Sequence, residues 1–154
     1  MENILKKIDR LNVTKRAKEL ADEFDTNIDF NAFGKNVMTR SELFLFAMAL
    51  GYNLKMKTHL EEIYPGGLIL ESSIDPKTLA LMYCGLIQEV KESDLDKITD
   101  KALVYSTAEM YANTGFSSLE DVLESYRSAY DYCLELSEDL QNQWDSFESQ
   151  SRES

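Results

Sequence analysis

The side chains best suited to acid–base or metal chemistry lie between residues 59 and 64. His59, the only histidine, is followed by Glu62 and Tyr64. If this segment were helical, His59 and Glu62 would share one turn and could bind the same ion. No third ligand and no recognisable nucleophile lies nearby in the sequence, so neither a metal site nor a catalytic site is complete. We therefore expect a non-catalytic protein without cofactor or metal. An enzyme that uses these three side chains is the minor alternative.

Lysine and arginine form one concentrated patch, near the N-terminus. Its members are Lys6, Lys7, Arg10, Lys15, Arg16 and Lys18. A solvated helix face is the favoured interpretation, and contact with nucleic-acid phosphates is the alternative. No aromatic residues alternate with the basic ones, although stacking on single-stranded bases would need them. These six residues are the candidate phosphate contacts.

Negative charge dominates the rest of the chain. The net charge of the protein is −12, and residues 61–154 contain twenty Asp or Glu against six Lys or Arg. Such a surface repels the nucleic-acid backbone and suits a basic protein partner. It also permits a second nucleic-acid-related role, in which the acidic region mimics DNA and occupies the basic groove of a nuclease.

The length and the apolar pattern predict one soluble domain. The chain has 154 residues, of which 44% are hydrophobic, enough for one packed core. No apolar run approaches the ~20 residues that cross a bilayer, and the first residues lack a secretory signal. We expect a cytoplasmic protein with one helical domain over 1–148 and a disordered tail over 149–154. Cys84 and Cys133, each on the apolar side of an expected helix, are interpreted as buried thiols.

A short helix over 39–51 is expected at the centre of the fold. Its eight residues from Leu43 to Leu50 are all apolar, so the helix should be buried on every side. Thr39 and Glu42 have the spacing of a capping box at a helix start. Gly51 is interpreted as the residue that ends the helix.

The remaining pattern predicts an all-α, single-domain bundle of five to six helices. Besides the central helix, helices are expected over 2–11, after Thr14, after Asp75-Pro76 and from Ser93 to Gly115. Residues 25–38 read as a loop, and 68–70 as a short extended segment without an evident partner. A second capping box, Ser117 with Glu120, should begin a long C-terminal helix over 118–147.

The long C-terminal helix carries apolar residues in alternating steps of four and three. Val122, Tyr126, Ala129, Cys133, Leu136 and Leu140 form this seam, which we expect to pack against the central helix. Trp144 and Phe147 continue the apolar edge beyond it. Together with Tyr126 and Tyr130 they are the candidate surface for a protein partner or for self-association.

Three segments together resemble a known family. They are Arg40–Tyr52, which contains Phe46-Ala47-Met48-Ala49-Leu50-Gly51-Tyr52, the helix after Asp75-Pro76, and Ala108–Phe116 with Leu119 following, which contains Tyr111-Ala112-Asn113-Thr114-Gly115. Their order and spacing over residues 15–125 are similar to those of small proteins associated with the Dnd systems of DNA phosphorothioation in bacteria and archaea. The resemblance implies an accessory role in defence against foreign DNA and supplies no catalytic residue. The leading hypothesis is an accessory protein that acts by protein–protein binding, and the alternative is a nucleic-acid-related module.

Overall fold

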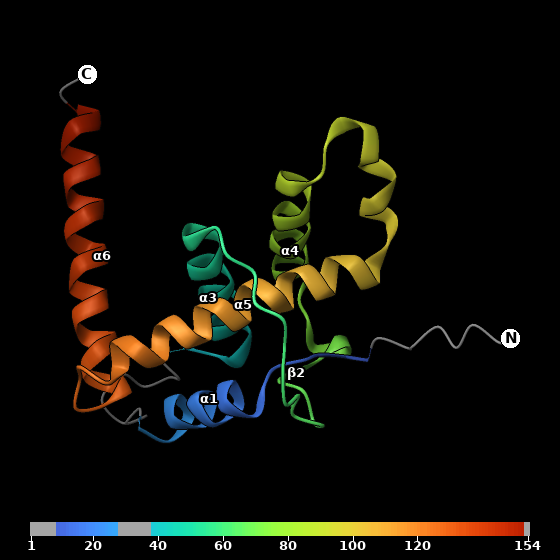
Figure 1. Cartoon of the computed structure of the whole chain (residues 1–154). Helices are drawn as coiled ribbons and strands as arrows, with labels where there is room; N and C mark the ends of the chain where they lie inside the picture. Colours follow the sequence, from blue (N-terminus) through green and yellow to red (C-terminus); the bar gives the residue numbers. More distant parts are fainter. Residues whose placement is uncertain (1–8, 28–37, 153–154) are drawn as a thin grey trace, which may run out of the picture.

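The computed structural model describes residues 9–27 and 38–152, and within these ranges the chain is mainly α-helical. Five α-helices, two short strands and two 3-10 helices follow one another in the described residues (Figure 1). They are β1 (Arg10–Leu11), α1 (Lys15–Asn27), α3 (Arg40–Leu54), β2 (Ile69–Leu70), η1 (Glu71–Ser73), α4 (Pro76–Glu89), η2 (Glu92–Thr99), α5 (Lys101–Leu123) and α6 (Ala129–Arg152). The predicted all-α fold with a long C-terminal helix is confirmed.

Helix α3 lies in the core, and its first turn forms as the sequence predicts. The Thr39 side chain accepts a hydrogen bond from the Glu42 amide, and the Glu42 carboxylate accepts one from the Thr39 amide at 2.7 Å. These two bonds satisfy amides that the helix itself leaves unpaired. Leu43 and Phe44 are almost completely buried. The burial is not complete on every side, because Ala49 is exposed.

The closest approach between helices is the crossing of α3 and α5, and glycines make it possible. A Cβ built at Gly51 would meet the backbone of Tyr111, with the carbonyl carbon at 2.8 Å. A Cβ at Gly115 would meet Ala47 in the same way, with its Cα at 2.8 Å. The expectation that Gly51 and Gly115 end helices is therefore wrong. Both lie inside helices, where the absence of a side chain lets two backbones touch.

Helix α5 contacts more of the fold than any other described element. It crosses the molecule in Figure 1 and contacts α1, α3, α4 and η2. The predicted helix start at Ser117 is wrong, because α5 runs unbroken to Leu123. Ser117 donates to the Asn113 carbonyl one turn earlier, and Glu120 pairs with Arg16 of α1. The break between α5 and α6 falls at residues 124–128 instead.

The N-terminal segment of the described chain is extended, which corrects the predicted helix over 2–11. Residues 2–8 of that predicted helix lie outside the described residues. Arg10 and Leu11 pair antiparallel with Leu70 and Ile69, so the extended segment over 68–70 does have a partner. Leu11 is fully buried. Most of the predicted loop over 25–38 also lies outside the described residues, while 25–27 belong to α1.

Local capping determines where α1, α4 and α5 begin. The Thr14 hydroxyl accepts a hydrogen bond from the Ala17 amide at 3.1 Å, which confirms the predicted start of α1. Asp75 caps α4 by accepting from the amides of Lys77 and Thr78, both at 2.9 Å, with Pro76 at the first helical position. Asp100 caps α5. The predicted helix from Ser93 is wrong over its first turns, which form the 3-10 helix η2.

Helix α6 projects from the body of the molecule (Figure 1). It begins at Ala129, not near 118, and continues to Arg152, so residues 149–152 are helical where a disordered tail was expected. The described contacts of α6 with another helix are mainly to α1, so the predicted packing of its seam on the central helix is wrong. Within the described ranges, no helix is both long and apolar enough to cross a membrane.

We predict that Gly115→Ala destabilises the protein although alanine is the better helix former. Propensity alone would stabilise α5 by about 1 kcal/mol. The added methyl meets the α3 backbone, and such overpacking costs about 1–3 kcal/mol or more. Urea denaturation should show a net loss of stability. The control Ser117→Ala, at an exposed site on the same helix, should stay within about 0.5 kcal/mol of the wild type. A Gly115→Ala protein as stable as the wild type would contradict the close crossing.

We also predict that the capping contribution of Asp75 depends on pH. Hydrogen bonds from Thr78 and Lys77 hold the pKa of its carboxyl below the ordinary 3.8. A depressed pKa in the folded state means that stabilisation is complete above the unfolded value and is lost as pH falls through the folded value. Urea titrations at a series of pH values should show the stability gap between wild type and Asp75→Ala narrowing below pH 3.8. Asp75→Asn, which caps without titrating, should keep its gap from Asp75→Ala.

Candidate interaction surface

The C-terminal half of α6 is not buried by any other described part of the chain. Every residue from Gln141 to Ser151 is exposed. Hydrogen bonds within the helix, such as Gln141 to Asp145 at 2.8 Å, are local. An isolated helix shorter than about 12–15 residues is only marginally stable in water, because packing usually supplies most of a helix's stability. This half of α6 therefore depends on its own backbone hydrogen bonds and on its continuity with the partly buried base of the same helix.

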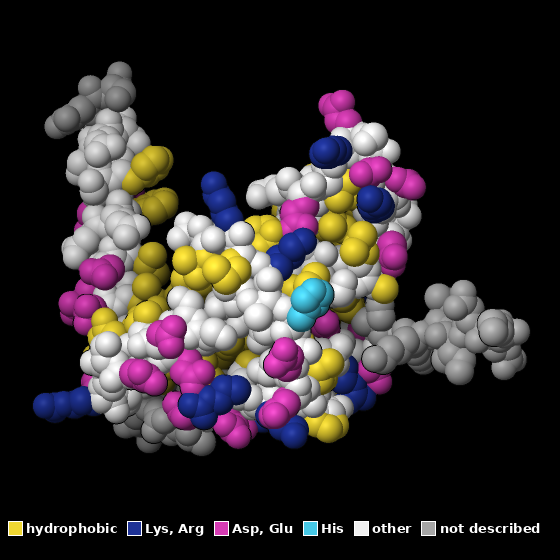
Figure 2. Space-filling view, viewed as in Figure 1, with side chains coloured by type: hydrophobic (Ala, Val, Ile, Leu, Met, Phe, Trp, Pro, Cys, Tyr) yellow, Lys and Arg dark blue, Asp and Glu magenta, His cyan; other side chains and the backbone are white. Residues whose placement is uncertain are grey.

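One face of α6 carries a continuous apolar stripe. Its members are Cys133, Leu136, Leu140, Trp144 and Phe147, in steps of three, four, four and three residues. Exposure rises along this stripe from 9% at Cys133 to 55% at Leu140 and 62% at Phe147. The rings of Trp144 and Phe147 lie 6.2 Å apart. Figure 2 shows hydrophobic side chains along the edge of α6 that faces the body of the molecule.

An open notch separates this edge of α6 from the body (Figure 2). In Figure 1 one end of α3 lies on the side of the body nearest α6. The C-terminal end of α3 bears the exposed apolar residues Leu54 and, just beyond the helix, Met56. Near the base of α6 lies an apolar hollow of about 350 Å³. It is lined by Met38, Cys133, Leu136, Ser137, Leu140 and Gln141. The hollow gives the stripe a depression that an incoming side chain can fill.

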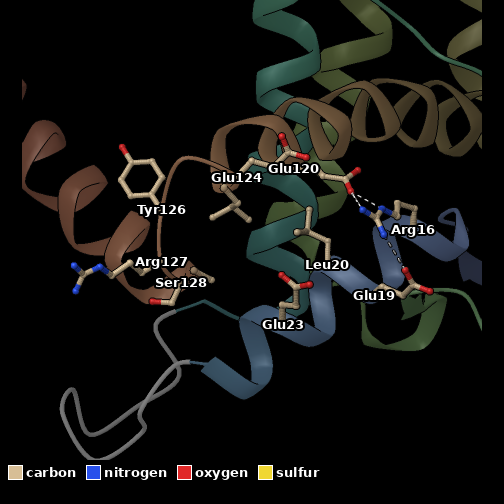
Figure 3. A pocket seen from close by; sticks show the side chains of 11 residues that line it. Arg16, Glu19, Leu20, Glu23, Glu120, Glu124, Tyr126, Arg127 and Ser128 are labelled. Atoms are coloured by element: carbon tan, nitrogen blue, oxygen red, sulfur yellow. Dashed lines mark hydrogen bonds and ion pairs between the residues drawn. The ribbon is translucent and has the colours of Figure 1, made fainter.

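A second, polar pocket lies at the junction of α1, α5 and the α5–α6 linker (Figure 3). Its lining includes four carboxylates, those of Glu19, Glu23, Glu120 and Glu124. Arg16 occupies one side and contacts Glu120 and, at 3.5 Å, Glu19. The pocket is therefore partly neutralised by an arginine of the chain itself. The ion pair between Arg16 and Glu120 links α1 to α5.

The four predicted partner-surface residues fall into two groups. Trp144 and Phe147 lie together on the exposed half of α6, as the sequence predicts. Tyr126 lies in the linker before α6, where its ring packs edge-on against Tyr132 at 5.4 Å. Burial and a hydrogen bond with Glu135 raise the pKa of Tyr126. Tyr126 and the half-buried Tyr130 thus belong to the base of α6 and not to its free end.

The structure pairs most of the described basic patch with carboxylates. Arg10 contacts Asp9 at 2.8 Å, and Arg16 contacts Glu120. Lys18 pairs with Asp22, one turn further along α1. Exposed ion pairs contribute little stability, but each places a negative charge beside the cation that would have to meet a phosphate. Lys15 is exposed on α1, and Lys6 and Lys7 lie outside the described residues.

The segment with His59 and Glu62 is not helical, and Glu62 has a positive φ of 49°, so these side chains do not share a helical turn. The segment runs along α5: the Thr58 amide donates to the Met110 carbonyl at 3.2 Å, and the Asn113 side chain donates to the His59 carbonyl at 3.1 Å. The His59 side chain is exposed. In the described residues no group of three or more His, Cys, Asp or Glu side chains could hold a metal ion.

A tyrosine pair where α3, α4 and α5 meet has the most strongly altered titration. Tyr52 and Tyr111 stack with ring centroids 3.8 Å apart. Desolvation raises the pKa of Tyr52, and desolvation together with a hydrogen bond to Glu89 raises that of Tyr111 to about 12. Lys57 pairs with the same Glu89 at 2.7 Å. Because both phenols stay neutral at ordinary pH, the pair acts as packing between helices.

Sequence reasoning missed several members of the exposed surface. The sequence places Leu140 in a seam that is expected to pack inside the domain. It places Leu54 and Met56 in no candidate surface. Cys133 is buried as expected, but Cys84 is exposed, which corrects its interpretation as a buried thiol. The unbroken spacing from Cys133 through Phe147 was the available signal. It predicts that Leu140 lies on the same face of the helix as Trp144 and Phe147.

Comparison with known proteins identifies no relative of this chain. No protein-family model, no curated protein and no solved structure matches the chain.

We predict that Trp144 is freely accessible in the isolated protein. It is the only tryptophan and is 58% exposed, so intrinsic fluorescence reports this one site. Acrylamide should quench its emission nearly as efficiently as that of a free tryptophan derivative. The reference is a Trp144→Phe, Phe116→Trp variant, whose indole would occupy a buried position on α5 and should be protected if the variant folds. Strong protection of Trp144 in the wild type would mean that α6 is covered in solution.

Proposed function

We propose that this protein is a non-catalytic accessory protein that works by binding another protein through the exposed half of α6. The observation that carries the proposal is the run from Gln141 to Ser151, a helical segment in which every residue is exposed and which presents Trp144 and Phe147 on one face. Aromatic side chains such as these dominate the energetics of protein interfaces. An apolar patch of this kind on a soluble domain marks a surface that becomes covered.

We further propose that the biological setting is a defence system linked to DNA phosphorothioation. The support for it is the resemblance of Arg40–Tyr52, the helix after Asp75-Pro76, and Tyr111–Gly115 to the small Dnd-associated proteins. Two of these three segments contain the glycines of the α3–α5 crossing. The resemblance thus rests on residues that determine the fold, and it speaks to function only through the fold.

The nucleic-acid-related alternative has less support from the geometry. Direct DNA binding would use Arg10, Arg16 and Lys18, each of which contacts a carboxylate. A protein that mimics DNA would present its carboxylates to the basic groove of a nuclease and would not need an apolar stripe. It therefore leaves Trp144 and Phe147 unexplained, whereas binding to a protein explains both the charge and the stripe.

The proposal predicts that Trp144→Ala with Phe147→Ala abolishes partner capture without affecting the fold. Both side chains are exposed, so thermal stability should change by no more than about 0.5 kcal/mol. Tagged wild-type and variant proteins expressed in the native host would be compared by quantitative affinity purification. The control is Leu95→Ala, a half-exposed apolar residue on η2, which should capture partners like the wild type.

Two results would contradict the proposal. One is a double variant that retains every protein captured by the wild type. The other is catalytic turnover by the purified wild-type chain that depends on His59.

A further inference from the structure

The apolar stripe of α6 has the geometry of a surface for another helix. From Cys133 to Phe147 it rises about 21 Å along the axis, at 1.5 Å per residue, which matches about four turns of a partner helix. Steps of three and four residues create the row of holes into which the side chains of a facing helix insert. The hollow between Met38 and Leu140 provides one such hole near the base.

The charge around the stripe selects the kind of helix that fits. Helix α6 contains six Asp or Glu and a single basic residue, Arg152. At 100° per residue, Asp139 and Glu148 border the stripe on opposite sides. A second copy of this chain would bring an equally acidic helix into contact, and like charges at an interface oppose binding. Two lysines near the end of α3 are exposed: Lys57 is paired with Glu89, and the single charge of Lys55 does not offset the six carboxylates of α6.

We propose that the stripe of α6 binds a basic amphipathic helix, with the apolar side chains of the partner on Leu136, Leu140, Trp144 and Phe147 and its lysines or arginines beside Asp139 and Glu148. This inference rests on the proposed function and names the chemistry of the partner at the same surface. The net charge of −12 attracts such a partner from a distance, and the stripe holds it after contact.

The test is a titration of the full chain with designed peptides that lack tryptophan and tyrosine. The probe is an 18-residue helix with leucine at i, i+3, i+4 and i+7 and lysine elsewhere. A scrambled peptide has the same composition without an apolar face, and a third peptide carries glutamate in place of lysine. The emission of Trp144 should shift to shorter wavelength, and acrylamide quenching should fall, only with the leucine–lysine helix. Raising the salt from 50 to 300 mM should weaken binding by roughly tenfold.

Variants of α6 separate the apolar and the charged parts of the proposal while keeping Trp144 as the reporter. Leu140→Asp with Phe147→Asp should weaken binding of the leucine–lysine peptide by at least about tenfold, whereas Leu95→Asp on η2 should not. Asp139→Lys with Glu148→Lys should also weaken it and should favour the glutamate peptide. Glu138→Lys with Asp145→Lys makes the same change in net charge on the opposite face of α6 and should have the smaller effect. Circular dichroism would verify that each variant is folded.

Several results would overturn the inference. Equal binding of the scrambled peptide, or of the leucine–lysine peptide to the Leu140→Asp, Phe147→Asp variant, would reduce the effect to general charge attraction. A concentration-dependent dimer that buries Trp144 without peptide, seen by sedimentation and fluorescence, would make a second copy the occupant. If no peptide binds while Trp144→Ala with Phe147→Ala still abolishes partner capture, the basic helix is wrong and the proposed function stands. If capture is also unaffected, both fail.

Discussion

The backbone contact between α3 and α5 is the constraint on which the rest of the fold depends. Two helices can approach so closely only where one of them carries no side chain at the contact. Gly51 of α3 provides this against the Tyr111 backbone, and Gly115 of α5 provides it against the Ala47 backbone. The close approach brings Leu43 and Phe44 of α3 into the core. It also fixes α5 as the axis against which α1, α4 and η2 pack. One crossing therefore positions nearly every described element.

The parts of the fold that depend on near neighbours in sequence could be predicted. The caps at Thr39 and Asp75 involve side chains within three residues of the amides they satisfy, so the local pattern is sufficient. The roles of Gly51 and Gly115 could not be predicted in the same way. A glycine within a helix and a glycine after one look alike in sequence, and only the distant partner helix distinguishes them. The pairing of Arg10–Leu11 with Ile69–Leu70 was hidden for the same reason.

The same distinction between local and distant contacts applies to the candidate interaction surface. Trp144 and Phe147 could be recognised because two large aromatic residues follow the end of a predicted seam. The sequence could not reveal that Leu140 is exposed with them, since a spacing of three and four residues describes a helix face buried in its own domain and one that awaits a partner equally well. What decides between them is whether another element of the chain covers α6, and beyond Gln141 none of the described elements does.

The position of α3 within the chain has a consequence for synthesis. Its apolar run emerges from the ribosome before α4, η2 and α5, while the helix that covers it comes last of these. At the usual rate of translation the delay is on the order of several seconds, long compared with the microseconds in which a helix forms. During that interval one of the most apolar segments of the protein has no partner. Newly made chains should therefore depend on a chaperone until Gly115 has left the exit tunnel and the crossing can close.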